Sequence, residues 1–170
     1  MSMIQTERLN LIPLTHDRLQ KYLLADHSLE DDLQLAHIDL VIAPELKEAI
    51  EQVFLPNTAN PEKNYLFSTL WTIILRSANR MVADLCIVDE PNDNGEIEIG
   101  YGTYVAEQGK GYMTEAVGGI IQWAKQQPSV KAIVAGTDKT NIASYTILQK
   151  NGFIRSGETE TGFSWRLELY

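Results

Sequence analysis

A glycine-rich hexapeptide, Gln108-Gly109-Lys110-Gly111-Tyr112-Met113, lies where a strand pattern ends and an amphipathic helix pattern begins. The first amides of a helix lack partners inside the helix and carry the positive end of its dipole, so they can bind a phosphate or a pyrophosphate. The candidate donors are the successive amides of Gly109 to Thr114. Taken alone, the hexapeptide fits such an anion site and a tight turn without a ligand equally well.

Two common nucleotide-binding motifs do not fit this turn. A dinucleotide-binding G-x-G-x-x-G would need its third glycine at Thr114, and it would need a preceding βαβ context. A P-loop requires Ser or Thr directly after its lysine, whereas Gly111 follows Lys110. What remains is a short glycine turn that presents its amides to an anion.

The strand that leads into the turn begins at Glu96 and has two different faces. By the two-residue period of a strand, one face carries Ile97, Ile99, Tyr101, Thr103 and Val105. The other face carries Glu96, Glu98, Gly100, Gly102 and Tyr104. A face with two glycines beside a glutamate packs poorly, but it lets a ligand or another backbone approach closely.

Other reactive residue types show no pattern typical of a site. Cys86 lies between Leu85 and Ile87, which favours a buried side chain over a nucleophile. No G-x-S-x-G sequence surrounds a serine, which disfavours a covalent acyl-serine route. Three widely separated histidines lack the spacing of metal ligands, so no metal site is expected: they are His16, His27 and His37.

The elements before the turn are predicted from hydrophobic period and turn chemistry. A first strand is expected over 4–14 with Pro13 near its end, and Thr15 is expected to cap a helix carrying Leu19 and Tyr22. Pro44 should open a further helix that Pro56 stops, followed by a loop over 56–63. Strands over 65–76 and 81–88, together with the one from Glu96, predict an antiparallel meander on short turns at 77–79 and 91–95.

The elements after the turn complete an α+β (mixed α/β) chain that forms a single domain over residues 1–170. The helix from Met113 carries an apolar stripe and ends before Pro128; its members are Met113, Ala116, Val117, Ile120, Ile121 and Ala124. A buried strand is expected over 130–135, and Asn141 should cap a helix that stops at Gly152. Two closing strands are expected over 153–155 and 163–169.

Composition narrows the class of protein and its partners. The net charge of −9 disfavours nucleic acid and an anionic membrane, because phosphate contacts need clustered Lys and Arg. The chain has no apolar run of the roughly 18–20 residues that span a bilayer and no signal-peptide pattern. A single cysteine permits no internal disulfide. These features predict a cytoplasmic protein.

Four segments together resemble the GNAT acetyltransferases, and especially the branch that contains the RimJ/RimL-type ribosomal-protein N-acetyltransferases. T-E-R-L at 6–9 is similar to the first strand of that branch. E-I-G-Y at 98–101, G-K-G-Y-x-T-E-A at 109–116 and N-x-A-S-x-x-x-L-x-K-x-G-F at 141–153 follow in the order of the family. The family's acetyl-CoA signature, Q/R-x-x-G-x-G/A, corresponds to Gln108–Met113. Met113 replaces the last small residue, and its place on the apolar stripe predicts that it packs inward.

The resemblance implies a GNAT-like fold, with a central, mostly antiparallel twisted sheet, a V-shaped splay between two strands and flanking helices. It implies acetyl-CoA as the acetyl donor, with the pantetheine arm between the splayed strands. The cofactor-binding residues that it implies are the backbone of Tyr104 and Val105, and Gln108, Gly109, Lys110, Gly111, Tyr112, Met113 and Thr114 in the turn. Asn141, a helix cap by its own pattern, contacts CoA by the same resemblance.

Two catalytic residues follow from the resemblance. Glu98 matches the position at which some GNAT enzymes carry their general base; the alternative is that it only orders the strand or orients the acceptor. Ser144 matches a serine near the CoA sulfur, so it is the candidate proton donor, directly or through water; the alternative is a first-turn serine satisfied by its helix. Many GNAT enzymes use a tyrosine acid one turn later, where this chain has Leu148.

The function that the resemblance implies is acetyl-CoA-dependent N-acetylation of a primary amine by direct transfer in a ternary complex. The acceptor is a protein N-terminus or a small-molecule amine, and no motif identifies it. A monomer and a homodimer are both compatible with the sequence. The alternatives are a non-catalytic CoA-binding or interaction module and a structural domain with an empty turn.

Overall fold

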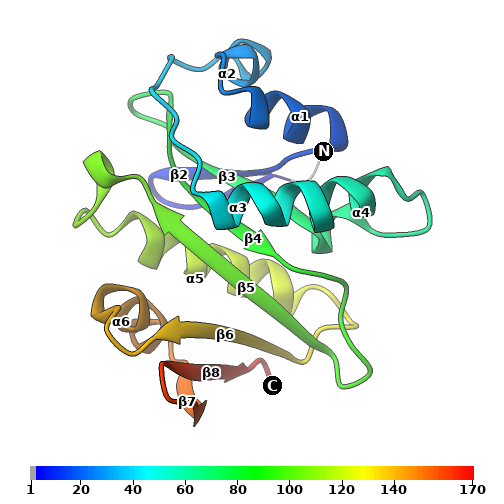
Figure 1. Ribbon diagram of the computed structural model, residues 1–170. Helices are drawn as coiled ribbons and strands as arrows, with labels where there is room; N and C mark the ends of the chain where they lie inside the picture. The colour runs from blue at the N-terminus through cyan, green and yellow to red at the C-terminus, as the bar shows by residue number, and fades with distance from the viewer. Residues whose placement is uncertain (1–2) are drawn as a thin grey trace.

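The computed structural model describes residues 3–170, which build one eight-stranded sheet with helices on both faces (Figure 1). The strands are β1 (Ile4–Gln5), β2 (Leu9–Pro13), β3 (Thr69–Leu75), β4 (Arg80–Ile87), β5 (Glu96–Thr103), β6 (Ala132–Asp138), β7 (Ile154–Glu158) and β8 (Gly162–Glu168). The α-helices are α1 (His16–Leu24), α2 (Ser28–Leu33), α3 (Pro44–Ala49), α4 (Leu55–Ala59), α5 (Tyr112–Lys125) and α6 (Ile142–Lys150). Three shorter helical turns are η1 (Ile50–Phe54), η2 (Tyr65–Phe67) and η3 (Val105–Glu107).

The predicted meander is confirmed by the pairing of β3, β4 and β5, and the sheet is mostly antiparallel. Its order is β1-β2-β3-β4-β5-β6-β8-β7. Every neighbouring pair is antiparallel except β5 and β6, which run parallel because the chain crosses between them through α5. This one parallel junction lies directly beside the glycine turn.

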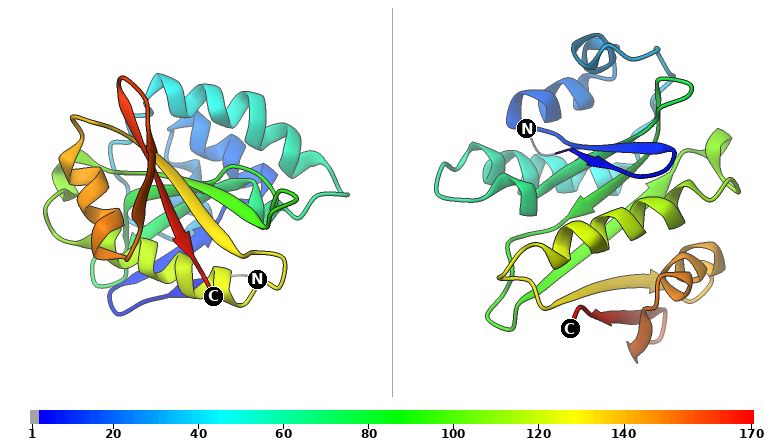
Figure 2. Two further views of the ribbon diagram at one scale, coloured as in Figure 1. Left: turned by 90° about the horizontal axis from the view of Figure 1, so that it is seen from below. Right: turned by 180° about the vertical axis from the view of Figure 1, so that it is seen from behind.

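The two faces of the sheet bury separate apolar clusters. Helices α5 and α6 cover one face, and α1 to α4 cover the other, as the view from below in Figure 2 shows. The α5 stripe packs as predicted: Ala116, Val117 and Ile120 are fully buried. Burial of one such Val or Ile side chain contributes about 1.5–3 kcal/mol, so the packing of α5 fixes the turn at its N-terminus.

The first expected strand is instead a hairpin of β1 and β2. The backbone turns at Thr6 to Arg8, and the Thr6 amide donates to the Leu9 carbonyl at 2.9 Å. The guanidinium of Arg76 donates to the carbonyls of Thr6 and Glu7, which stabilises this turn from a distant strand. Pro13 closes β2, as expected. The period-two pattern missed the turn because its stabilising partner is remote in sequence.

Pro56 does not stop its helix, contrary to the prediction. The helix runs from Pro44 to Ala59 and contains the π-helical turn η1, whose wider winding is marked by the Leu55 amide donating to the Ile50 carbonyl. A proline clashes with the carbonyl four residues earlier in a regular α-helix, and the wider turn just before Pro56 relieves that contact. The expected loop shrinks to residues 60–64, and 65–67 form η2 before β3 begins.

A buried carboxyl group links α1 to the centre of the sheet. Asp84 on β4 is only 5% exposed, and it accepts hydrogen bonds from the hydroxyls of Tyr22 at 2.6 Å and Tyr104 at 2.9 Å. Burial raises the pKa of Asp84 to about 6, although both phenol hydrogen bonds act in the opposite direction. The folded protein therefore holds the proton of Asp84 more tightly than the unfolded chain does.

Asp84→Asn is expected to remove a pH-dependent loss of stability. Because the folded pKa of about 6 exceeds the ordinary carboxyl value of 3.8, the stabilising contribution of protonated Asp84 is complete only below that ordinary value and is lost as the pH rises through 6. The free energy of unfolding of the native chain should therefore fall by roughly 2 kcal/mol against that of the variant between pH 4 and 7. Urea titrations across this range measure the difference, with Asp93→Asn in an exposed turn as the control. A difference that does not change with pH would contradict the assignment.

Candidate active site

Strands β5 and β6 separate part-way along their length, as the predicted splay requires. They pair only from Glu96 to Glu98 on β5, opposite Ala132 to Val134 on β6. Beyond this point β5 stays paired with β4 as far as Thr103, while β6 stays paired with β8 as far as Asp138. Glu98 is therefore the last residue of β5 that pairs with β6, and it lies at the apex of the V.

The edge of β5 that faces the splay carries the backbone groups of odd-numbered residues. The Tyr104 amide donates to the Val82 carbonyl at 3.1 Å, and the Glu98 carbonyl accepts from the Val88 amide at 3.0 Å. Even-numbered residues of β5 thus bond to β4, and because backbone groups alternate along a strand, those of Tyr101 and Thr103 face the opening. The open edge of β5 beside the cavity is therefore that of Tyr101 and Thr103, while the Tyr104 amide bonds to β4.

The glycine turn has the backbone geometry of an anion cradle. Gly109 and Gly111 have φ values of 78° and 81°, in the left-handed region that disfavours residues with a Cβ atom. Within residues 3–170, no hydrogen bond uses the amides of Gly109, Lys110 or Gly111 as a donor, and the first helical bond comes from Glu115 to the Gly111 carbonyl. Successive unpaired amides at the N-terminus of the fourteen-residue helix α5 can therefore converge on a phosphate.

A buried ion-pair network supports the turn from the side of β4. Glu107 is 8% exposed, and both of its oxygens accept from Arg80, at 2.9 and 3.1 Å. The ammonium of Lys110 lies 3.2 Å from the same carboxylate. The hydrogen bond from Arg80 is the largest cause that lowers the pKa of Glu107. The Lys110 ammonium is thus paired with Glu107, and Lys110 does not line the cleft.

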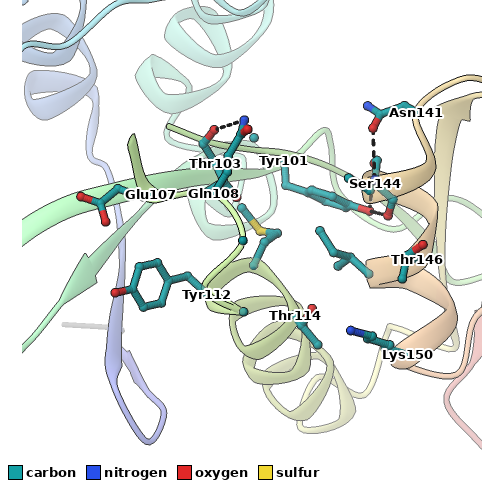
Figure 3. A pocket seen from close by; sticks show the side chains of 16 residues that line it. Tyr101, Thr103, Glu107, Gln108, Tyr112, Thr114, Asn141, Ser144, Thr146 and Lys150 are labelled. Carbon is teal, nitrogen blue, oxygen red and sulfur yellow. Dashed lines mark hydrogen bonds between the residues drawn. The ribbon is translucent and has the colours of Figure 1, made fainter. Parts of the chain in front are cut away.

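The opposite wall is the N-terminal half of α6, which a phenol joins to β5. Asn141 caps the helix as predicted, accepting from the Ser144 amide at 3.1 Å. The Tyr101 hydroxyl donates to the Ser144 carbonyl at 2.8 Å and accepts from the Ser144 hydroxyl at 3.3 Å (Figure 3). Burial raises the pKa of Tyr101. Leu148, where the resemblance noted above places a tyrosine acid in many GNAT enzymes, is fully buried in the core.

A cavity of about 570 Å³ lies between these two walls, within the usual range for ligand sites. Of the residues predicted from sequence, its lining includes Gln108, Gly109, Gly111, Tyr112, Met113, Thr114, Asn141 and Ser144. The lining does not include Glu98, Tyr104, Val105 or Lys110. The lining is completed by residues outside the predicted binding and catalytic sets: Tyr101, Gly102, Thr103, Glu107, Ala143, Thr146, Ile147 and Lys150.

The cavity residues fit the charge and shape of acetyl-CoA. An added Cβ at Gly109 would meet no atom within 4 Å, so the turn leaves open space where a pyrophosphate needs it. Met113 is 2% exposed and packs in the apolar cluster, so it borders the cavity from the core side. Lys150 extends from α6 toward the first turn of α5, which brings an ammonium to the cleft in place of Lys110 (Figure 3).

Glu98 lies on the far face of the sheet from the glycine turn. By alternation its side chain shares a face with Gly100 and Gly102, and that face is the one covered by α1 to α4. The side chain is exposed. Glu98 is the last residue of β5 that pairs with β6, so it adjoins the opening between the strands. Its side chain is accessible from the other side of the sheet.

Within the part of the chain that the structure describes, no group of three or more His, Cys, Asp or Glu side chains has an arrangement that could hold a metal ion. None of the helices between residues 3 and 170 has both the length and the apolar character needed to cross a membrane. The Cys86 thiol is largely buried, which raises its pKa to about 11 and disfavours a thiolate nucleophile.

Comparison with known proteins gives the same architecture over nearly the whole chain. An acetyltransferase of the GNAT family from Bacillus anthracis covers 99% of both chains with a TM-score of 0.66 at 16% identity. RimL, a ribosomal L7/L12 α-N-protein acetyltransferase solved in complex with coenzyme A, covers 98% of both chains with a TM-score of 0.68 at 15% identity. The ribosomal-protein-S5-alanine acetyltransferase from Vibrio fischeri covers 99% of this chain and 97% of its own, with a TM-score of 0.66 at 15% identity.

Sequence comparison identifies the family. The N-acetyltransferase YjdG of Bacillus subtilis (strain 168) is 32% identical over 95 residues, so the aligned part spans 56% of this chain and 56% of that relative. The family model described as "Acetyltransferase (GNAT) domain" matches residues 8–154, which include the splay, the glycine turn and α6. GNAT acetyltransferases use acetyl-CoA as their donor. This chain belongs to the GNAT acetyltransferase family.

Proposed function

We propose that this chain transfers the acetyl group of acetyl-CoA to a primary amine, by direct attack of the amine in a ternary complex, in the cytoplasm. The observation that carries the proposal is that two features lie in one cavity. The unpaired amides of Gly109 to Gly111 lie at one end, and the Ser144–Tyr101 hydroxyl pair lies at the other. RimL, a protein of the same fold, was solved in complex with coenzyme A, which supports CoA as the ligand class.

Donor binding divides between the turn and the open edge of β5. The amides of Gly109 to Thr114 would bind the pyrophosphate, because they have no partners and lie at the positive end of the α5 dipole. Lys150 adds a positive charge across the cavity. The backbone of Tyr101 and Thr103 would bond the pantetheine arm in the way a missing strand would. Bound acetyl-CoA supplies a thioester, whose carbonyl carbon accepts the amine nitrogen.

The transfer needs one base and one acid, and the chain offers one of each on opposite sides of the splay. Glu98 would take the proton that the attacking amine must lose, directly or through water. As the new N–C bond forms and the C–S bond breaks, Ser144 would give a proton to the departing sulfur. The Tyr101 hydroxyl, which accepts the hydrogen bond of the Ser144 hydroxyl, holds that group in the cavity.

The acceptor side is the face covered by α1 to α4. Glu98 is exposed there beside Gly100 and Gly102, so an extended amine can approach the apex of the V without a side-chain barrier. The net charge of −9 favours a cationic acceptor and disfavours nucleic acid as a partner. Within this class we propose a protein N-terminus or a small-molecule amine as the acceptor.

Calorimetric titration with acetyl-CoA tests the donor site. We expect saturable binding of one molecule and thermal stabilisation, since a ligand at 100 times its dissociation constant adds about 2.7 kcal/mol to the free energy of unfolding. A chain that shows neither would contradict the proposal and would favour a structural domain with an empty turn. Tight binding without thiol release against any amine would favour the non-catalytic CoA-binding module.

A further inference from the structure

Arg8, on the β1–β2 hairpin, contacts the backbone of the glycine turn. Its guanidinium Nη1 donates to the Lys110 carbonyl at 3.0 Å. The same guanidinium lies 4.9 Å from the centre of the Tyr112 ring, and its Nη2 is 3.4 Å from the position that a Cβ atom would take at Gly111. The Arg8 side chain thus contacts Lys110 and Tyr112 and lies beside Gly111 between them, yet it does not line the cavity.

Glu115, in the first turn of α5, fixes the orientation of Arg8. Its Oε1 accepts from Arg8 Nε at 2.7 Å, and its Oε2 accepts from the Arg8 amide at 2.9 Å and from the Thr6 hydroxyl. The carboxylate therefore ties the hairpin to the helix through both side chain and backbone. Thr6 and Arg8 belong to the T-E-R-L segment and Glu115 to the T-E-A segment, which lie more than 100 residues apart and meet only here.

The contact with Lys110 sets the direction of the Gly111 amide. The described chain has no cis peptide bond, so the carbonyl of Lys110 and the N–H of Gly111 point in opposite directions across one planar group. When Arg8 holds the carbonyl on its side, the N–H points away from Arg8. Gly111 lines the cavity and Lys110 does not, so this orientation suits a donor aimed at the ligand. Glycines on both sides of Lys110 leave the peptide free to rotate without such a contact.

Arg8 also balances a charge that would otherwise oppose anion binding. Glu115 lies in the first turn of α5, where its carboxylate would repel a pyrophosphate bound at the same helix terminus. The ion pair at 2.7 Å neutralises that carboxylate, and its side chain is only 17% exposed, so solvent screens it weakly. Arg80 and Lys110 do the same for Glu107 on the other side of the turn.

We propose that Arg8 is a positioning residue of the donor site, which orients the Lys110–Gly111 peptide toward the pyrophosphate and neutralises Glu115 without touching the ligand. The inference rests on the proposed function, because it needs a CoA pyrophosphate at the turn. It assigns a role to the T-E-R-L segment, which the binding and catalytic residues described above leave unused. Two motifs more than 100 residues apart in the sequence then act together on one group of the donor.

The experiment compares dissociation constants, by calorimetry, for CoA and for 3′-dephospho-CoA, which keeps the pyrophosphate. The variants are Arg8→Ala and Arg8→Lys; the lysine keeps the charge but cannot reach Glu115 and the Lys110 carbonyl together. Arg18→Ala is the matched control, because Arg18 forms a similar ion pair with Asp32 at 2.9 Å on the other face of the sheet and its loss changes net charge equally. Melting without ligand establishes that each variant is folded.

Arg8→Ala should bind both ligands at least about tenfold more weakly than the native chain, Arg8→Lys should be intermediate, and Arg18→Ala should stay within about twofold. In assays of acetyl transfer, the KM for acetyl-CoA should rise while kcat at saturation stays unchanged. Equal affinity in Arg8→Ala and the native chain would overturn the inference, and so would a loss confined to CoA, which would mean that Arg8 touches the 3′-phosphate. If the native chain itself does not bind CoA, the proposed function fails as well.

Discussion

Gly109→Glu is expected to reduce CoA affinity by about 100-fold or more, which corresponds to roughly 2.8 kcal/mol. A side chain at Gly109 would enter open space, since no atom lies within 4 Å of the added Cβ, and Gly109 lines the cavity. A carboxylate there would lie beside the unpaired amides and compete with the pyrophosphate for them. Calorimetric titration of the variant with CoA measures the loss. Gly111 is a less clean position, because a side chain there starts 3.4 Å from Arg8 Nη2.

Gly109→Gln is the matched control for that experiment. Both variants place a side chain of the same size on a residue with φ near 78°, so both carry the same backbone strain of about 1–2 kcal/mol. The difference between them isolates the charge, and we expect the glutamine variant to bind CoA much more tightly than the glutamate variant. Equal affinities for the glutamate variant and the native chain would move the pyrophosphate away from this turn.

Glu98→Gln is expected to lower kcat by about 100-fold or more, because a positioned general base contributes roughly 10²–10⁴ in rate. The dissociation constant of CoA should not change, since Glu98 lies on the other face of the sheet and does not line the donor cavity. The loss should depend on pH, because the variant can no longer gain a base as the pH rises. Initial rates of thiol release across a pH series measure both effects.

Two further variants, Ser144→Ala and Glu62→Gln, are compared with Glu98→Gln in the same assay of thiol release. The serine variant should lose turnover without the change in pH dependence, since its role is to donate a proton to sulfur. Glu62 is exposed in the 60–64 loop, so its substitution should leave the rate as it is. A Glu98→Gln profile with the height and shape of the native one would remove Glu98 from the mechanism and leave it an ordering role.

The parts of the fold and site that sequence could predict are those fixed by local chemistry. The glycine turn, the apolar stripe of α5 and the Asn141 cap depend on residues within a few positions of each other, and the structure has all three. The meander followed from strand patterns separated by short turns. Four separate segments in family order then placed these elements around one cleft.

What sequence could not predict depends on partners remote in the chain. The open edge of β5 belongs to Tyr101 and Thr103 because β4 takes the even-numbered residues, and the strand pattern alone does not say which edge is paired. The sequence suggests the Lys110 side chain as a phosphate ligand, whereas the structure pairs its ammonium with Glu107 at 3.2 Å.

Asp84 and Arg8 likewise depend on partners that are remote in the sequence. Asp84 gave no signal because its burial comes from two tyrosines on other elements. Arg8 lies in a segment whose partner, Glu115, is more than 100 residues away. A polar residue in a strand pattern is normally expected to face solvent, and for Asp84 only the packing of α1 on the sheet reverses that expectation.

The central claim is that this chain moves an acetyl group to an amine, and thiol release from acetyl-CoA tests it most directly. The protein at saturating acetyl-CoA is given a panel of peptide N-termini and small primary amines, with Gly109→Glu as the negative control. We predict release of one CoA thiol for each N-acetylated product formed with at least one amine, and none above the buffer rate with the variant. Saturated binding of acetyl-CoA with no thiol release above the buffer rate for any amine would contradict the account.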